Sequence, residues 1–337
     1  MKSQRSLSGS EEPFSQPANR NPEVDMADFD APDEDERQTL NRRLFTYTPP
    51  AIKAAVTVDR IMVNYPAFAD AMEGLDRVFQ LGRELSVQQG ITIMGASGSG
   101  KTALVRYFLS SQPKSNLFEE GYGAIAIRLT GRPTVGYVVG GLLRRLRYPF
   151  PRVVAQTLDI KRQVLIDALR QKRTRLILID EAQYLLTQAR LHGRAQATHC
   201  NVTDVVRELM DEVPIAVALM GTSELLELEG ADAHLANRMS ARFELRGLDV
   251  PAVWHGFVRS FAKQSTAIDL SHLAGKEDVA RLYQATAGNL RSFKRLVTEA
   301  TLVAVDESER VVTRSHLRTA FDRVSGKAAS KENPYAT

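Results

Sequence analysis

The segment Gly95-Ala-Ser-Gly-Ser-Gly-Lys-Thr102 constrains the fold of this chain more than any other feature. It matches the pattern GxxxxGK[ST], follows the apolar run Ile91–Met94 and opens a stretch with helical periodicity. Glycines in such a turn let backbone N–H groups surround phosphate oxygens, and the N-terminus of the helix adds positive potential. The segment therefore predicts a phosphate-binding loop (P-loop) whose contacts come from Gly95, Ala96, Ser97, Gly98, Ser99, Gly100, Lys101 and Thr102.

Two carboxylates, Asp180 and Glu181, directly follow another apolar run, Leu176–Ile179. Open α/β sheets bind their ligands at the carboxyl ends of buried strands. We expect Lys101 to contact the β and γ phosphates, Asp180 and Thr102 to hold Mg²⁺, and Glu181 to orient and polarise the attacking water. The sequence thus predicts a catalytic site for hydrolysis with ATP and Mg²⁺ as cofactors.

Short apolar runs alternate with helical patterns up to about residue 250, which is typical of a parallel sheet flanked by helices. The further strands expected are Ala124–Leu129, Ile215–Met220 and, as a candidate, Arg242–Arg246. Beyond residue 250 only helical patterns remain. The predicted fold class is α/β with a C-terminal all-helical lid. The expected organisation is a disordered acidic leader (1–40), a nucleotide-binding α/β domain (41–248), a helical lid domain (249–325) and a flexible tail (326–337).

The charges are unevenly distributed along the chain. Residues 1–40 contain 4 basic and 10 acidic side chains, whereas the remainder of the chain contains 40 basic and 30 acidic side chains. A cationic body favours a polyanionic partner such as nucleic acid, although an ordinary surface excess explains it equally well. Candidate DNA contacts are Arg132, Arg144, Arg145 and Arg147, with Lys172, Arg173 and Arg175 as a further cluster; each is as well explained as surface charge.

Other patterns exclude whole classes of protein. No apolar run is long enough to span a membrane, and no apolar segment typical of a signal peptide precedes residue 40. The single cysteine, Cys200, cannot form an internal disulfide, so we expect a cytoplasmic protein without membrane contact. His192, His199 and Cys200 match no metal-binding spacing, and we expect no metal site there.

Further residues resemble the AAA+ branch of P-loop ATPases. Thr222 resembles sensor 1, with Ser223 as the alternative, and Arg291 in Gly288-Asn-Leu-Arg291 resembles sensor 2. Arg238 resembles the arginine finger that reaches the nucleotide of a neighbouring subunit, and Arg242 is its rival.

Residues 55–320 as a whole resemble the TniB/TnsC family of transposition regulators and, more distantly, MuB, IstB and ExeA. The resemblance rests on Ile61-Met-Val-Asn-Tyr65-Pro66, Ile179-Asp-Glu-Ala-Gln183, Gly221-Thr-Ser-Glu-Leu225 and Leu235-Ala-Asn-Arg238. It implies that Tyr65 lies near the adenine. It also implies an ATPase that assembles as a ring or filament on double-stranded DNA and links a target-selection protein to a transposase. The alternative is an ExeA-like ATPase that acts on protein partners in secretion or envelope assembly.

Overall fold

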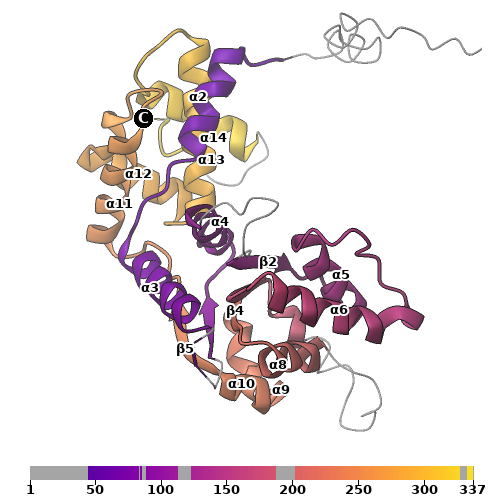
Figure 1. Cartoon of the computed structure of the whole chain (residues 1–337). Coiled ribbons are helices and arrows are strands. Elements are labelled where there is room, and N and C mark those ends of the chain that lie inside the picture. The colour runs from indigo at the N-terminus through magenta and orange to yellow at the C-terminus, as the bar shows by residue number, and fades with distance from the viewer. Residues whose placement is uncertain are drawn as a thin grey trace, which may run out of the picture. The chain divides into compact units, whose positions relative to one another are not determined.

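The structure, a computed structural model, describes residues 45–82, 84–85, 89–112, 123–186, 202–326 and 332–336. The chain divides into two units, Met1–Thr46 and Tyr47–Thr337. Every helix and strand described below belongs to the second unit (Figure 1). The leader expected at 1–40 lies outside the described residues, as do His192, His199 and Cys200.

Five parallel strands form one sheet in the order β2-β3-β4-β1-β5. Their bounds are β1 Gly90–Met94, β2 Ala124–Arg128, β3 Leu176–Asp180, β4 Ala216–Gly221 and β5 Met239–Glu244. The strand expected at 242–246 begins three residues earlier. Because the strands are parallel, the loops that follow them all emerge at one edge of the sheet. The prediction of a parallel sheet flanked by helices is confirmed.

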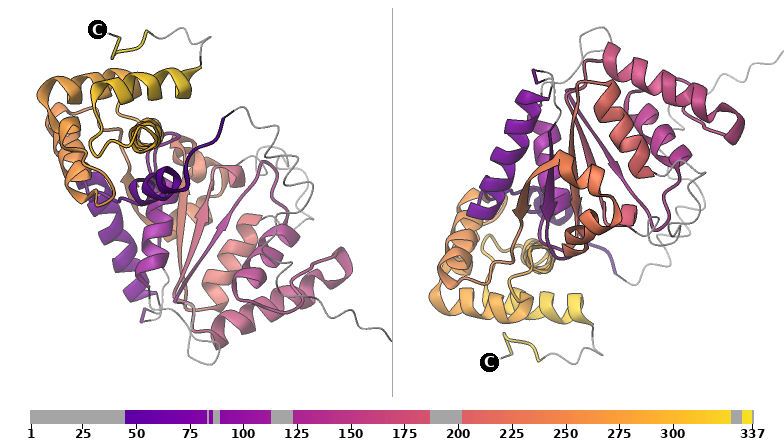
Figure 2. Two further views of the ribbon diagram at one scale, coloured as in Figure 1. Left: turned by 90° about the horizontal axis from the view of Figure 1, so that it is seen from above. Right: turned by 90° about the horizontal axis from the view of Figure 1, so that it is seen from below.

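The helices lie on both faces of the sheet and in a C-terminal group (Figures 1 and 2). Those in the sheet region are α3 Pro66–Leu81, α4 Lys101–Ser111, α5 Val135–Arg145, α6 Leu158–Gln171, α8 Val202–Glu212, α9 Leu228–Ala231 and α10 Ala233–Arg238, with 3-10 turns η2 Ala155–Thr157 and η3 Ser223–Glu227. The C-terminal group contains α11 Pro251–Gln264, η4 Ser271–Ala274, α12 Lys276–Thr286, α13 Leu290–Asp306 and α14 Arg314–Ser325. The helical character expected beyond residue 250 is therefore present.

Strand β3 explains why two layers of helices are needed. Its side chains alternate between the faces of the sheet, and all five residues are buried. Leu176 and Leu178 belong to the core that includes α3 and α4, whereas Ile177 and Ile179 belong to the core of α5, α6 and α8. Burial of each such side chain contributes about 1.5–3 kcal/mol, so both faces require a cover.

Aromatic side chains form the centre of the C-terminal helical group. Trp254, Phe257 and Phe261 of α11 contact Phe293 of α13 with ring centroids 5.4, 5.3 and 5.0 Å apart. The indole N–H of Trp254 donates to the backbone oxygen of Val279 at 2.9 Å, so its polar atom is satisfied. These residues share one core cluster with the α3–α4 face of the sheet.

Helix α2, Pro49–Asp59, has no counterpart among the elements expected from the sequence, and it begins with two prolines. Proline is tolerated in the first turn of a helix, where its missing N–H would have no partner, and the Thr48 side chain caps the helix. Helix α2 packs along α13, and the Tyr47 hydroxyl donates to Glu299.

Residues 332–336, part of the segment expected as a flexible tail (326–337), pack against the helical group. Tyr335 is 4% exposed and belongs to the core of the helical group. The Asn333 amide donates to the backbone oxygen of Arg318 at 3.0 Å and to Asp322 at 2.8 Å. A single aromatic anchor thus holds a polar segment that composition alone describes as mobile. Within the described residues, no helix is both long and apolar enough to cross a membrane.

Candidate active site

The P-loop joins the end of β1 to the start of α4. Gly98 and Gly100 have φ values of +83° and +100°, a left-handed backbone that favours glycine. A Cβ at Gly98 would lie 2.4 Å from Asn289 Oδ1, so only glycine fits beneath the lid. The Ser99 hydroxyl is buried without a hydrogen-bond partner among the described residues. This loop, at the N-terminus of α4, fits a phosphate chain.

Lys101 is the buried cation of this loop, with 7% of its surface exposed. Its Nζ donates to the backbone oxygens of Gly95 at 2.5 Å and Ala96 at 3.0 Å. Burial lowers the pKa of the ammonium group, and the carboxylates of Glu181 and Asp180 oppose that effect. Triphosphate oxygens would provide the negative partner that a buried ammonium group needs.

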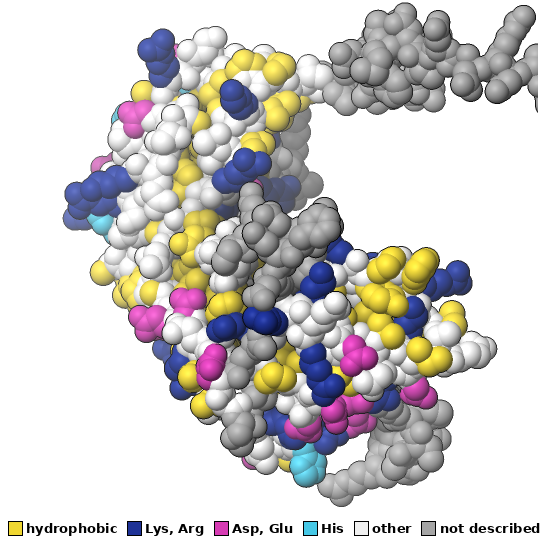
Figure 3. Space-filling view, in the orientation of Figure 1, with side chains coloured by type: hydrophobic (Ala, Val, Ile, Leu, Met, Phe, Trp, Pro, Cys, Tyr) yellow, Lys and Arg dark blue, Asp and Glu magenta, His cyan; other side chains and the backbone are white. Residues whose placement is uncertain are grey.

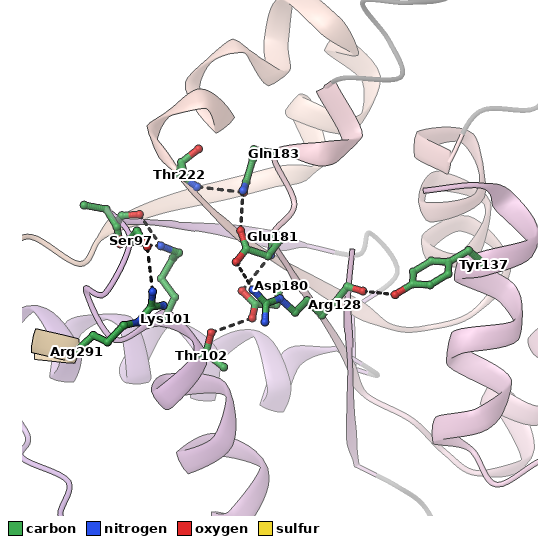
Figure 4. Close-up of polar contacts among 12 residues, drawn as sticks. Ser97, Lys101, Thr102, Arg128, Tyr137, Asp180, Glu181, Gln183, Thr222 and Arg291 are labelled. Atoms are coloured by element: carbon green, nitrogen blue, oxygen red, sulfur yellow. Dashed lines mark hydrogen bonds and ion pairs between the residues drawn. The ribbon is translucent and has the colours of Figure 1, made fainter. Parts of the chain in front are cut away.

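The residues expected to hold Mg²⁺ lie together. The Thr102 hydroxyl donates to Asp180 Oδ2 at 3.0 Å, between the start of α4 and the end of β3 (Figure 4). Hydroxyl and carboxylate oxygens are the ligands that Mg²⁺ prefers, and this ion usually retains several waters as well. When bound there, the ion would neutralise charge on the β and γ phosphates.

Both carboxylate oxygens of Glu181 have partners. Oε2 accepts from the Gln183 amide at 2.7 Å, and Oε1 accepts from Arg128, at the end of β2, at 2.8 Å (Figure 4). The hydrogen bond from Gln183 lowers the pKa of Glu181, and Arg128 adds to the effect against the opposing effect of burial. Glu181 has a φ of +57°, a strained backbone for a residue with a side chain. Because its pKa is lowered, the Glu181 side chain is an ionised carboxylate that can accept a proton from the attacking water.

The C-terminal helices reach the P-loop through Gly288-Asn-Leu-Arg291. The Asn289 amide donates to the backbone oxygen of Ser97 at 2.9 Å, while its Oδ1 caps α13 by accepting from the Ser292 N–H at 3.1 Å. Arg291 donates to the Ser97 hydroxyl at 3.3 Å. The buried Tyr65 hydroxyl donates to the backbone oxygen of Ser99 at 3.1 Å. These contacts close the loop between the sheet and the helical group.

A cavity of about 620 Å³ contains most of the residues predicted from the sequence. Thr222 lines it and the alternative Ser223 does not. The other predicted residues along its wall are Tyr65, Ser97, Gly98, Gly100, Lys101, Thr102, Glu181 and Arg291. Arg238 and Arg242 are not among the described residues that line it: Arg238 pairs with Asp211 on α8, and Arg242 is exposed on the edge strand β5.

Three residues at the site were missed by sequence reasoning. Arg128 reaches Glu181 because β2 and β3 pair with Arg128 opposite Asp180. Gln183 and Asn289 lie inside the quoted segments Ile179–Gln183 and Gly288–Arg291, but no role was assigned to them. The Asn289 cap has a local signal, since asparagine is favoured before the first turn of a helix. The contact of Arg128 with Glu181 and that of Gln183 with Thr222 have no local signal, because they depend on strand order.

The model of the family described as Bacterial TniB protein matches residues 53–247, which is more than half of the chain. The chain belongs to the TniB family. None of the curated proteins matches this sequence.

Solved structures similar to this TniB-family chain share its fold. The ORC1 protein of Aeropyrum pernix, in complex with DNA, matches with a TM-score of 0.57 and 16% identity over 79% of this chain and 67% of its own. The ORC2 protein of Aeropyrum pernix, with ADPNP and ADP, matches with a TM-score of 0.55 and 16% identity over 78% of this chain and 68% of its own. Cdc6p of Pyrobaculum aerophilum matches with a TM-score of 0.53 and 16% identity over 77% of this chain and 68% of its own. The fold is that of AAA+ ATPases, and this member of the TniB family is a P-loop ATPase.

Proposed function

We propose that this chain is an ATP-dependent regulator of DNA transposition that assembles into oligomers on double-stranded DNA. The observation that carries the proposal is the TniB family match together with one cavity that is lined by both Lys101 of the P-loop and the ionised Glu181. In this proposal, ATP binding drives assembly and hydrolysis reverses it. The assembly links a target-selection protein to a transposase.

Assembly would connect neighbouring copies through the nucleotide. Arg238 is 30% exposed at the end of α10 and does not line the cavity of its own chain as the structure describes it. An arginine at this surface position, once released from Asp211, would reach a second copy and contact its triphosphate in the transition state. We assign the arginine finger to Arg238 and keep Arg242 as the rival.

DNA contact is supported by charge and position. The candidates Arg132, Arg144 and Arg145 are exposed on the segment that follows β2 and on the last turn of α5. Arg147 follows directly and is exposed as well. Lys and Arg side chains surround this part of the face drawn in Figure 3. Contacts of this kind bind the phosphate backbone without reading sequence, and a related fold, ORC1, was solved in complex with DNA.

The test of the DNA-binding proposal is retention of duplex DNA by the full chain with Mg²⁺ and a non-hydrolysable ATP analogue. We expect binding with the analogue but not with ADP, and an affinity that falls steeply with salt, with a logarithmic slope of about −0.9 for each phosphate contact. An absence of DNA binding at low salt would contradict the proposal. An ATP hydrolysis rate that is unchanged by DNA but increased by protein partners would favour the ExeA-like alternative.

The Glu181→Gln variant tests the assignment of the base. Glutamine keeps the shape of the side chain but cannot accept a proton from water, so the chain should bind ATP, assemble and fail to hydrolyse. The measurements are single-turnover ATP cleavage and particle size by light scattering. Turnover at the unaltered rate would refute the role of Glu181.

A further inference from the structure

The side-chain amide of Gln183 lies between two parts of the active site. Gln183 is 8% exposed, and its Nε2 donates to Glu181 Oε2 at 2.7 Å. Its Oε1 accepts from the backbone N–H of Thr222 at 3.3 Å, directly after the end of β4 (Figure 4). One buried amide therefore joins the carboxylate that follows β3 to the turn that follows β4.

The fold determines which way this amide points. A backbone N–H can only donate, so the atom that faces Thr222 must be the amide oxygen. The amide nitrogen must then face Glu181, where it can only donate. Glu181 consequently receives a hydrogen bond whose direction is set by the main chain of a neighbouring strand.

The backbone around Gln183 brings the amide to this place. Glu181 has a φ of +57°, and its N–H bonds Asp180 Oδ1 at 3.0 Å, so the chain turns sharply after β3. The Ala182 N–H then donates to the backbone oxygen of Met220 at 2.8 Å, which pins the turn to β4. A Cβ at Gly221 would lie 2.5 Å from Gln183 Oε1, so the absence of a side chain at Gly221 makes room for the amide.

We propose that Gln183 is a positioning residue for ATP hydrolysis, because its amide fixes one carboxylate oxygen of Glu181 relative to Thr222 and the end of β4. The proposal rests on the role assigned to Glu181 under the proposed function. The partner of the other oxygen, Arg128, has a side chain that is 64% exposed, and solvent weakens such pairs. Gln183 is therefore the firmer contact, and its loss would let the carboxylate rotate away from the attacking water.

The first test replaces Gln183 with methionine in the full chain, with ATP, Mg²⁺ and duplex DNA present. Gln183→Met keeps the length of the side chain and removes both hydrogen bonds. We expect kcat to fall about 10- to 100-fold, as small misplacements of catalytic groups cause. The Kd for ATP should stay within about 3-fold, because a contact used only in the transition state changes kcat and not binding. An unchanged kcat in this variant overturns the proposal.

Two further variants separate positioning from packing. Gln183→Glu has the shape of glutamine and keeps an acceptor for Thr222, but presents an oxygen instead of a donor to Glu181. It should lose at least as much kcat as Gln183→Met when assayed at about pH 8, and repulsion between the two carboxylates should lower its melting temperature; normal turnover overturns the proposal even if the methionine variant does not fold. Gln163→Met, at an exposed position on α6, is the control and should leave kcat unchanged.

The Glu181→Gln variant separates a failure of the positioning role of Gln183 from a failure of the proposed function. If that variant is inactive while both Gln183 variants turn over normally, the positioning role fails and the proposed function stands.

Discussion

The guanidinium group of Arg238 pairs with both carboxylate oxygens of Asp211, at 2.7 and 2.9 Å. Arg238 ends α10 and Asp211 lies in the last turn of α8, so the pair joins two helices of the same chain. Arg238 also donates to the backbone oxygen of His234 at 3.0 Å. An arginine that contacts the nucleotide of a neighbouring copy must exchange Asp211 for phosphate oxygens. Under the proposed function, the pair would therefore oppose assembly through Arg238.

Replacement of Arg238 by alanine should abolish hydrolysis and spare nucleotide binding. A transition-state arginine contributes about 10³-fold or more to the rate, whereas binding depends on the P-loop of the same chain. The measurements are the ATPase rate and fluorescent ATP binding in the same preparation. Arg246→Ala is the matched control, because Arg246 pairs with Glu244 at 2.9 Å beyond β5. If Arg242→Ala is inactive and Arg238→Ala is not, the finger is Arg242.

Asp211→Asn should make assembly easier. The pair is partly exposed, with side chains 30% and 56% accessible, and such pairs contribute about 0.2–1 kcal/mol. Release of Arg238 should then lower the protein concentration for half-maximal ATPase activity by up to about 5-fold, with kcat unchanged. A lower kcat at saturating protein would instead mean that Asp211 orients Arg238 for catalysis.

Asn289 combines two roles that substitution can separate. Asn289→Ala removes the cap of α13 and the bond to Ser97, so we expect a loss of about 1 kcal/mol in the free energy of unfolding and weaker ATP binding. Asn289→Asp keeps the capping oxygen and removes the donor to Ser97. Its stability should stay near that of the unaltered chain while ATP binding weakens. Equal unfolding losses in both variants would contradict this separation.

Tyr65 should make stability sensitive to alkaline pH. Burial raises the pKa of its hydroxyl from 10.0 to about 12, so folding favours the neutral phenol. This contribution to stability is complete below the unfolded pKa and is lost as pH rises through the folded pKa. Tyr65→Phe loses the hydrogen bond to Ser99, about 1 kcal/mol near neutral pH. Urea unfolding at about pH 8 and about pH 11 should show this difference shrinking at the higher pH. A constant difference would contradict the prediction.

Local patterns in the sequence determined where the candidate catalytic residues lie. The glycines and Lys101 of the P-loop act within one turn of chain, and Asp180 and Glu181 directly follow a buried strand. Residues this close in sequence are placed by their own backbone, so spacing and residue type suffice to predict them. Periodicity likewise predicted the alternating strands and helices and the helical C-terminal group.

Tertiary structure decided which distant residues meet. Pairing of β3 with both β2 and β4 brings Arg128 to Glu181 and Thr222 to Gln183, and no local signal encodes that order. Packing of α10 against α8 selects Asp211 as the partner of Arg238. Burial of Tyr335 anchors a polar segment whose composition predicts mobility. Each of these contacts forms because the packing of the whole core favours it, and a short stretch of sequence does not specify that packing.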